Sequence, residues 1–292
     1  MVKIDKKDWK KELNDIIRGA SGGFLFGIPL LYTMEVWQIG SEIDSSLTLL
    51  ILLITYVTVF SLNRIEGFRR HKRDSLIDAI LESIEALAIG FVCSSATLIL
   101  LQRITITTPL EEILGKTIFE TVPFAIGAAL ARLLLSGEPT KPLSENGSFS
   151  QKSHNQNQIK VNDTLADISA SLMGTMIIAF SIAPTDEVRN LAVSASPPWL
   201  LAIVISSLLI SYMIVFTAGF TNQRKRQKQR GFFQTPETET IISYLIALIA
   251  SALMLWFFQR LNFEMTWFLW LQNTIILGLP AAIGGAAGRI AV

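Results

Sequence analysis

The segment from Leu47 to Leu62, which reads LTLLILLITYVTVFSL, decides the class of this protein because it is long, apolar and free of charge. A helix needs about 20 mostly apolar residues to cross the hydrocarbon layer of a bilayer. The whole chain shares this character, since 50% of its 292 residues are hydrophobic and 17% are charged. Soluble proteins usually carry about 25% charged residues. The composition therefore predicts an all-α membrane protein that crosses the bilayer several times.

Apolar segments of this kind recur along the chain, separated by polar or charged connections. Read by hydropathy, they predict eight transmembrane helices. The predicted spans are residues 20–39, 46–63, 79–101, 114–135, 164–184, 198–218, 240–258 and 268–290.

Lysine and arginine are distributed unevenly between the two sides that these spans define. With an even number of spans both termini share one side, and that side holds 21 of the 25 Lys and Arg residues. Segments rich in these residues stay in the cytoplasm. The distribution predicts that both termini are cytoplasmic and that the residues before the first span form a cytoplasmic amphipathic segment.

Two parts of the sequence resemble each other at a fixed distance of 157 residues. We therefore predict two four-helix repeats, residues 1–136 and 164–292, joined by a polar cytoplasmic linker at 137–163. Four spans is an even number, so the repeats would be parallel in the membrane. The matched pairs are Gln102 and Gln259, Pro123 and Pro280, Gly127 and Gly284, and Arg132 and Arg289.

Small residues and prolines recur inside the predicted spans. Glycines four residues apart allow two helix backbones to approach closely. A proline inside a helix removes one backbone hydrogen bond and permits a kink. The positions predicted to serve close packing or a kink are Gly23, Gly27, Pro123, Pro280, Gly284 and Gly288.

Four glutamates fall within the predicted spans, where an ionisable group costs roughly 2.5 kcal/mol or more on insertion scales. Glu82 and Glu85 share the acidic face of the third span with Asp78, and Glu35 and Glu120 are expected at a common depth. Simpler interpretations are open. Glu35 could reach the outer interface, and Glu120 could pair with Lys116 one turn away.

The duplication makes the glutamates of the first repeat more informative. At the 157-residue offset, Glu85 corresponds to Ile242 and Glu120 to Leu277. Acids that merely stabilised the repeat would be expected in both halves. We therefore predict an ion pathway in the first repeat, formed by Glu35, Glu82, Glu85 and Glu120.

The sequence contains few candidates for other chemistry. It has one cysteine, and its two histidines, His71 and His154, lie in polar connecting segments. No phosphate-binding P-loop and no metalloprotease motif occurs. We expect no catalytic residues, no metal site and no cofactor.

Two stretches, from Gly22 to Trp37 and from Leu279 to Arg289, carry a family resemblance. Through them the sequence resembles a family of bacterial integral membrane proteins classed as a domain of unknown function. The resemblance covers the whole chain. It implies a bacterial source, the cytoplasmic (inner) membrane and a single eight-helix architecture, and it implies no activity.

These observations favour an ion channel or ion-coupled transporter, with small cations or protons as the transported species. A membrane sensor or assembly partner that does not transport is one alternative, and a membrane-embedded lipid-modifying enzyme is another. The expected partner is the lipid bilayer, with no nucleic acid. The glycine-rich spans permit a homo-oligomer without requiring one.

Overall fold

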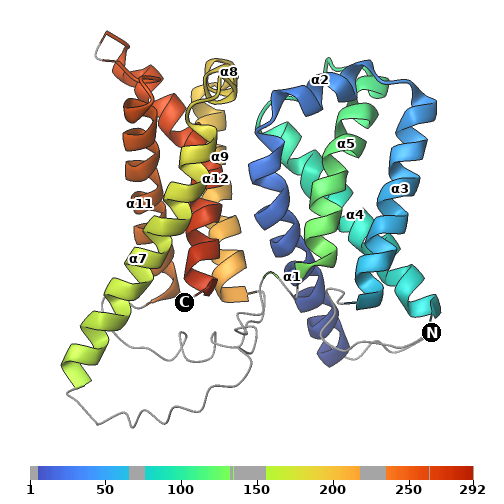
Figure 1. Cartoon of the computed structure of the whole chain (residues 1–292), viewed down its shortest axis with the longest axis horizontal. Helices are drawn as coiled ribbons and strands as arrows, with labels where there is room; N and C mark the ends of the chain where they lie inside the picture. Colours follow the sequence, from blue (N-terminus) through green and yellow to red (C-terminus); the bar gives the residue numbers. More distant parts are fainter. Residues whose placement is uncertain are drawn as a thin grey trace, which may run out of the picture.

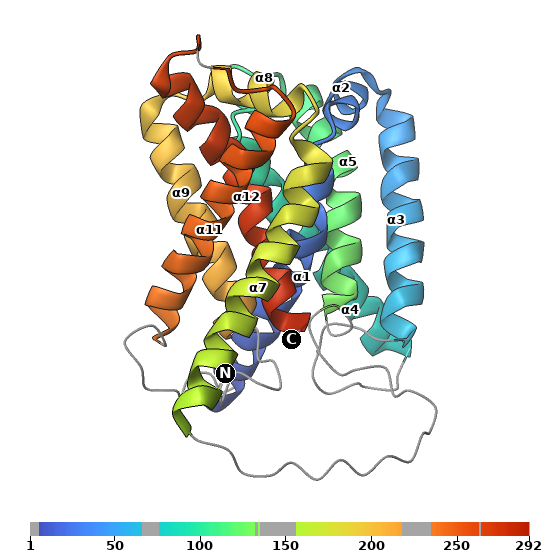
Figure 2. The same ribbon diagram turned by 60° about the vertical axis from the view of Figure 1, so that its left-hand side comes forward.

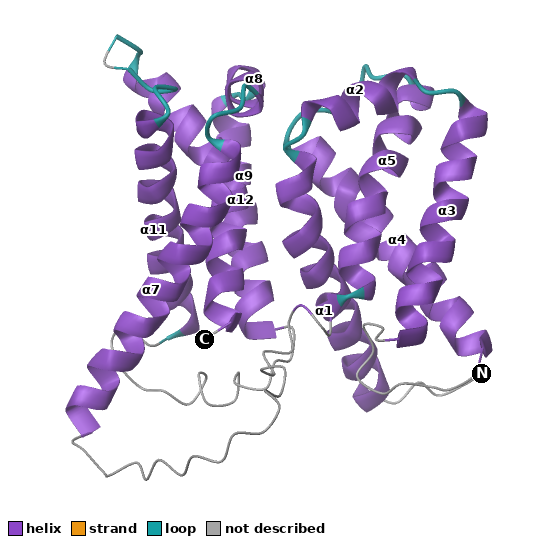
Figure 3. Ribbon diagram, viewed as in Figure 1, coloured by secondary structure: helices purple, strands orange, loops and turns teal. Residues whose placement is uncertain are grey.

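A computed structural model of the chain describes residues 6–65, 76–131, 134, 156–217, 235–262 and 264–291. All regular structure within these ranges is helical (Figure 3), so the prediction of an all-α protein is confirmed. The first half comprises α1 (Lys6–Leu31), α2 (Met34–Glu42), α3 (Ser45–Ile65), α4 (Leu76–Leu100) and α5 (Leu110–Ala129). The second comprises α7 (Gln156–Ile182), α8 (Glu187–Ser194), α9 (Pro197–Tyr212), the π-helical turn η1 (Met213–Thr217), α11 (Pro236–Phe257) and α12 (Trp267–Ala291).

Several of these helices are suited to cross a membrane. Within the described residues, α3, α4, α9 with η1, α11 and α12 are long and apolar enough, which gives five candidate spans. Counting each of two bent helix pairs as one span raises the number to seven. Helix α5 falls outside this count because Glu112, Lys116 and Glu120 lie within it. Eight spans therefore stays a prediction.

The first predicted span, residues 20–39, contains a sharp corner. Helix α1 stops at Leu31, and α2 starts at Met34 in a direction that differs by 89°. Trp37 of α2 stabilises this corner, because its Nε1 donates a 2.7 Å hydrogen bond to the carbonyl of Leu31. That carbonyl lies at the end of α1, where no further turn supplies a donor. Glu35 consequently lies in α2, beyond the corner at which α1 ends.

Helix α7 begins at Gln156, within the predicted linker at 137–163. The stretch 135–155 lies outside the described residues. At its far end α7 turns through 91° into the short helix α8. The second half therefore repeats the long-helix and short-helix corner of the first.

The two halves stand side by side, and α2 and α8 lie at the same end of the molecule (Figure 1). The long helices run roughly along one direction, as the rotated view shows (Figure 2). Helix α5 packs against α1, α2, α3 and α4, and α12 packs in the same way against α7, α8, α9 and α11. Each half is thus built around its own last helix.

The turn after α4 has the same conformation as the turn after α11. Gln102 has φ 56° and Gln259 has φ 58°, in the left-handed region that residues other than glycine rarely adopt. In both turns the next amide donates to a carbonyl five residues earlier, at 2.8 Å from Arg103 to Leu98 and at 2.8 Å from Arg260 to Leu255. This pattern of bonds ends many helices. The two Gln-Arg pairs of the sequence thus mark equivalent helix ends.

Glycines allow the central helices to approach their neighbours closely. A Cβ atom on Gly22 of α1 would press against the carbonyl oxygen of Gly127 of α5, and one on Gly174 of α7 against that of Gly284 of α12. A Cβ atom on Gly27 of α1 would press against the ring of Phe124 of α5. Such contacts between backbones are how small residues hold membrane helices together.

A buried hydrogen bond joins the two halves. Pro280 has no N–H, so the carbonyl of Ile276 one turn earlier in α12 lacks its helical donor. Tyr32, at the corner after α1, donates its hydroxyl to that carbonyl at 2.6 Å. Pro280 therefore creates an acceptor that the first half of the chain occupies.

We predict that Gly22→Ala destabilises the protein by about 1–3 kcal/mol, the usual cost of overpacking, because the new methyl group would force α1 away from α5. The midpoint of SDS-induced unfolding measures this loss. Gly23→Ala is a matched control from the adjacent residue, since its Cβ would lie 3.1 Å from the carbonyl oxygen of Phe124 and needs a smaller adjustment. Equal effects of the two substitutions would contradict the packing described above.

We also predict that Tyr32→Phe lowers stability by about 1–3 kcal/mol, because it leaves the buried carbonyl of Ile276 without a donor. Unfolding in detergent followed by circular dichroism measures the change. Tyr56→Phe serves as the control, since the Tyr56 ring stacks on Phe60 within α3 and the substitution keeps that ring. A Tyr32→Phe protein as stable as the control would argue against the role given to Pro280.

Candidate ion site at Glu120

Glu120 lies in the middle of α5, and its side chain is 0% exposed. Neither of its carboxylate oxygens has a hydrogen-bond partner among the described residues. Phe124 and Gly127 follow it at helical spacing, and both contact α1, so Glu120 lies on the side of α5 that faces α1. A buried carboxyl group without a partner is costly, which makes Glu120 the strongest candidate for function in this part of the chain.

Hydroxyl groups accompany Glu120 on α5. Thr117, one turn earlier, is buried, and its Oγ1 has no hydrogen-bond partner among the residues that the structure describes. Thr121 donates to the carbonyl of Thr117 at 2.7 Å and lies 3.2 Å from the hydroxyl of Ser94 on α4. The interface between α4 and α5 is therefore polar at the level of Glu120.

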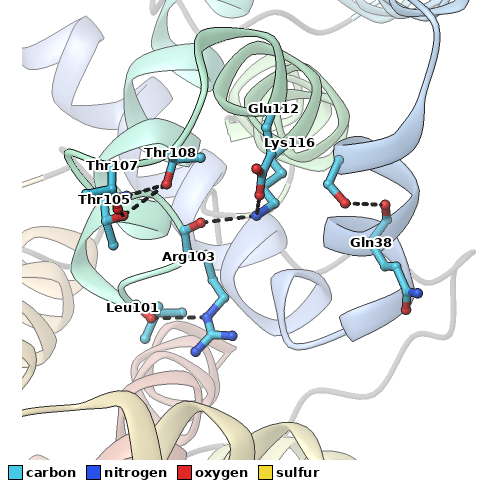
Figure 4. A network of polar contacts seen from close by, with 9 residues as sticks. Gln38, Leu101, Arg103, Thr105, Thr107, Thr108, Glu112 and Lys116 are labelled. Atoms are coloured by element: carbon cyan, nitrogen blue, oxygen red, sulfur yellow. Dashed lines mark hydrogen bonds and ion pairs between the residues drawn. The ribbon is translucent and has the colours of Figure 1, made fainter.

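The nearest cation along α5 is already bound elsewhere. The Nζ of Lys116 forms an ion pair with Glu112 and donates to the carbonyl of Arg103 at 3.3 Å, as Figure 4 shows. The alternative pairing of Lys116 with Glu120 is thus not the one formed. Lys116 therefore does not compensate the charge of Glu120, although both residues lie on α5.

The α2 end of the first half closes over this region. Gly40 of α2 contacts Gly115 of α5, about 7.5 Å along the helix from Glu120. The guanidinium of Arg103 lies 5.1 Å from the ring centre of Trp37 and donates to the hydroxyl of Ser194 at 2.6 Å. Burial lowers the pKa of Arg103 from its ordinary value. These contacts connect the corner of the first half to α8 of the second.

The other predicted pathway residues lie on either side of Glu120. Glu35 is exposed in the first turn of α2, at one end of the molecule. Glu82 and Glu85 are half-buried in the first half of α4, which begins at the opposite end (Figure 1). The four acids therefore do not form one cluster, and Glu120 is the fully buried member of the set.

The second half differs from the first at the same positions. Leu277, which corresponds to Glu120, is fully buried, and Gly278 stands in place of Thr121. Glu239, which corresponds to Glu82, forms an ion pair with the buried Arg289. Arg132, the counterpart of Arg289, lies outside the described residues. At the 157-residue offset, the buried carboxyl group of Glu120 is thus matched by an apolar side chain, that of Leu277.

The predicted prolines and glycines lie in both halves of the molecule. Pro123 lies within α5 one turn after Glu120, and Pro280 occupies the matching place in α12. Gly23 packs on Phe124, and Gly288 packs on the carbonyl of Ala170. These contacts bring the helices close together at the predicted positions.

The hydroxyls of Thr117, Thr121 and Ser94 were not predicted from the sequence. Serine and threonine are common inside membrane helices, where they usually bond to their own backbone. The signal that could have revealed them is the spacing of Thr117, Glu120 and Thr121, which places two hydroxyls within one turn of the acid. Within the described ranges, no three His, Cys, Asp or Glu side chains gather as they would around a metal ion.

The model of one protein family matches residues 15–292, and its description reads "Putative integral membrane protein (DUF2391)". The chain belongs to this family. This finding confirms the resemblance to membrane proteins with a domain of unknown function. Neither a curated protein nor a solved structure matches the chain. Membership of DUF2391 together with the apolar helices identifies an integral membrane protein, which contacts the lipid bilayer.

Proposed function

We propose that this protein carries cations across a membrane, as a channel or an ion-coupled transporter, through its first half. One observation carries the proposal: Glu120 is fully buried, and its carboxylate oxygens have no partner among the described residues. Ionisable groups inside a membrane are rare and commonly mark ion or proton pathways. The absence of a similar acid at Leu277 supports a function confined to one half.

The proposed path has three levels. Glu120 forms the central level, in the middle of α5. Glu85 and Glu82 line the approach from the end at which α4 begins, and Glu35 lies at the opposite mouth on α2. A cation passing between the mouths would meet a carboxylate at each level.

The proposal includes a topology of eight spanning helices arranged as two parallel repeats. It is supported by the matching turns at Gln102 and Gln259, by the bends of 89° and 91°, and by the equivalent glycine contacts. In this arrangement residues 1–136 form the first repeat, 164–292 form the second, and 137–163 connect them. Helices α1, α3, α4, α5, α7, α9, α11 and α12 would each cross once.

The proposed orientation places both termini in the cytoplasm of a bacterium, with the protein in the inner membrane. Helix α1 begins and α12 ends at the same end of the molecule (Figure 1). By sequence, most of the lysine and arginine falls in the N-terminal segment and in the connections predicted on the side of the termini, which favours the cytoplasmic side. The mouth at Glu35 would then face outward.

We predict that purified protein in liposomes moves ions down an imposed gradient and that Glu120→Gln reduces this flux to the background of empty liposomes. The amide keeps the size of the side chain and removes its ability to carry charge. K⁺, Na⁺, Ca²⁺ and proton gradients are imposed in turn and followed with ion-sensitive dyes. Glu85→Gln and Glu35→Gln are expected to reduce flux less, because these side chains are more exposed.

Glu237→Gln is the control, since Glu237 is an exposed acid in the first turn of α11 in the second half. It should retain wild-type flux. Absence of flux for every ion, from protein shown to be folded and correctly inserted, would overturn the transport proposal.

A further inference from the structure

The surroundings of Glu120 determine which ion a single carboxyl group could handle. In α1, no charged residue lies between Arg18 and the end of the helix, and Arg18 pairs with Asp15 at 2.7 Å. Tyr32, at the corner after α1, is committed to the carbonyl of Ile276. The helix that Glu120 faces therefore supplies no cation at its level.

The other helices packed on α5 are similar. The charged residues of α4 are Asp78, Glu82 and Glu85, all in its first half. Beyond Glu85 its one titratable group is the thiol of Cys93. Helix α3 carries Tyr56 and, at its last turn, Arg64. The charged residues of α2 are both acids, Glu35 and Glu42, and on α5 itself Lys116 is paired with Glu112. In the described part of the chain, these helices carry more acidic than basic residues.

The hydroxyls beside Glu120 are partly committed as well. Thr121 donates to the carbonyl of Thr117, and Ser94 lies within hydrogen-bond distance of Thr121. A calcium ion would need six to eight oxygen ligands and a magnesium ion an octahedron of six. The carboxylate of Glu120 and the Oγ1 of Thr117 form a much smaller set. A proton needs one oxygen and removes the charge of the carboxylate altogether.

We infer that the ion handled by this protein is the proton, and that Glu120 carries it by alternating between its carboxylic acid and carboxylate forms. The inference rests on the transport function proposed above. Binding forms one O–H bond on the Glu120 carboxylate, and release breaks that bond and returns the proton to water on the other side. No electron moves in either step. The neutral acid requires no countercharge, which fits the residues found around it.

This inference also explains the contrast with the second half. Leu277 fills the place of Glu120 with an apolar side chain, so the second half has no group that could exchange a proton at this depth. The second repeat would then act as a support. Its buried hydrogen bond to Tyr32 attaches it to the corner next to the proton pathway.

The first arm of the test measures flux with the full-length protein in liposomes that contain a pH-sensitive dye. A pH gradient is imposed with the membrane potential clamped by potassium and valinomycin, and Na⁺, K⁺ and Ca²⁺ gradients are imposed at equal pH on both sides. We expect proton movement in the wild type and in Glu237→Gln, loss of it to the empty-liposome level in Glu120→Gln, and no movement of metal ions without protons.

The second arm does not depend on transport. Dicyclohexylcarbodiimide reacts with carboxyl groups that are protonated and in apolar surroundings, and peptide mass spectrometry locates the label. We expect the peptide containing Glu120 to be labelled near neutral pH and less so at alkaline pH, with no label on Glu237.

The outcomes separate the two levels of the argument. Flux of a metal ion without protons, or a Glu120 that stays unlabelled near neutral pH while flux persists, would overturn the proton inference and leave transport standing. A protein that is folded and labelled at Glu120 but moves no ion would overturn the transport function and this inference with it.

Discussion

Every polar group in the apolar layer must find a partner within the protein, because lipid chains offer none. The fold meets this requirement mainly by local bonds. Thr55 donates to the carbonyl of Ile51 and Ser207 to that of Ile203, each at 2.7 Å. Where a helix is interrupted, a side chain from another element completes the bonding, as Trp37 does at the end of α1. Tyr32 does the same at the carbonyl that Pro280 leaves free.

Glu120 departs from this rule on the same helix that holds the first half together. Helix α5 contacts every other helix of its half, so its middle is the most enclosed part of that half. A charged group buried there without a partner lowers stability. Packing alone does not require it, since leucine fills the matching place in α12. The departure is therefore best explained by a function that needs a carboxyl group at this depth.

Hydropathy was sufficient to predict the helical class and most of the helices, because each apolar segment carries its own signal. It could not predict the corner between α1 and α2, because hydropathy does not show where a helix within an apolar stretch ends and the chain changes direction. The turns at Gln102 and Gln259 were visible as a repeated Gln-Arg pair, although their left-handed conformation was not. The sequence suggested Glu120, one turn after Lys116, as a partner for it. The fold uses Glu112, consistent with the preference for an acid on the N-terminal side of a lysine.

The most direct test of the central claim is the infrared spectrum of the protein in lipid bilayers near neutral pH, recorded as the difference between wild type and Glu120→Gln. Our account predicts a carbonyl stretching band of a protonated carboxylic acid that is present in the wild type, shifts in heavy water and disappears in the variant. A wild-type spectrum in which the variant removes only the bands of an ionised carboxylate would contradict it, because Glu120 would then hold a stable charge with a partner of its own.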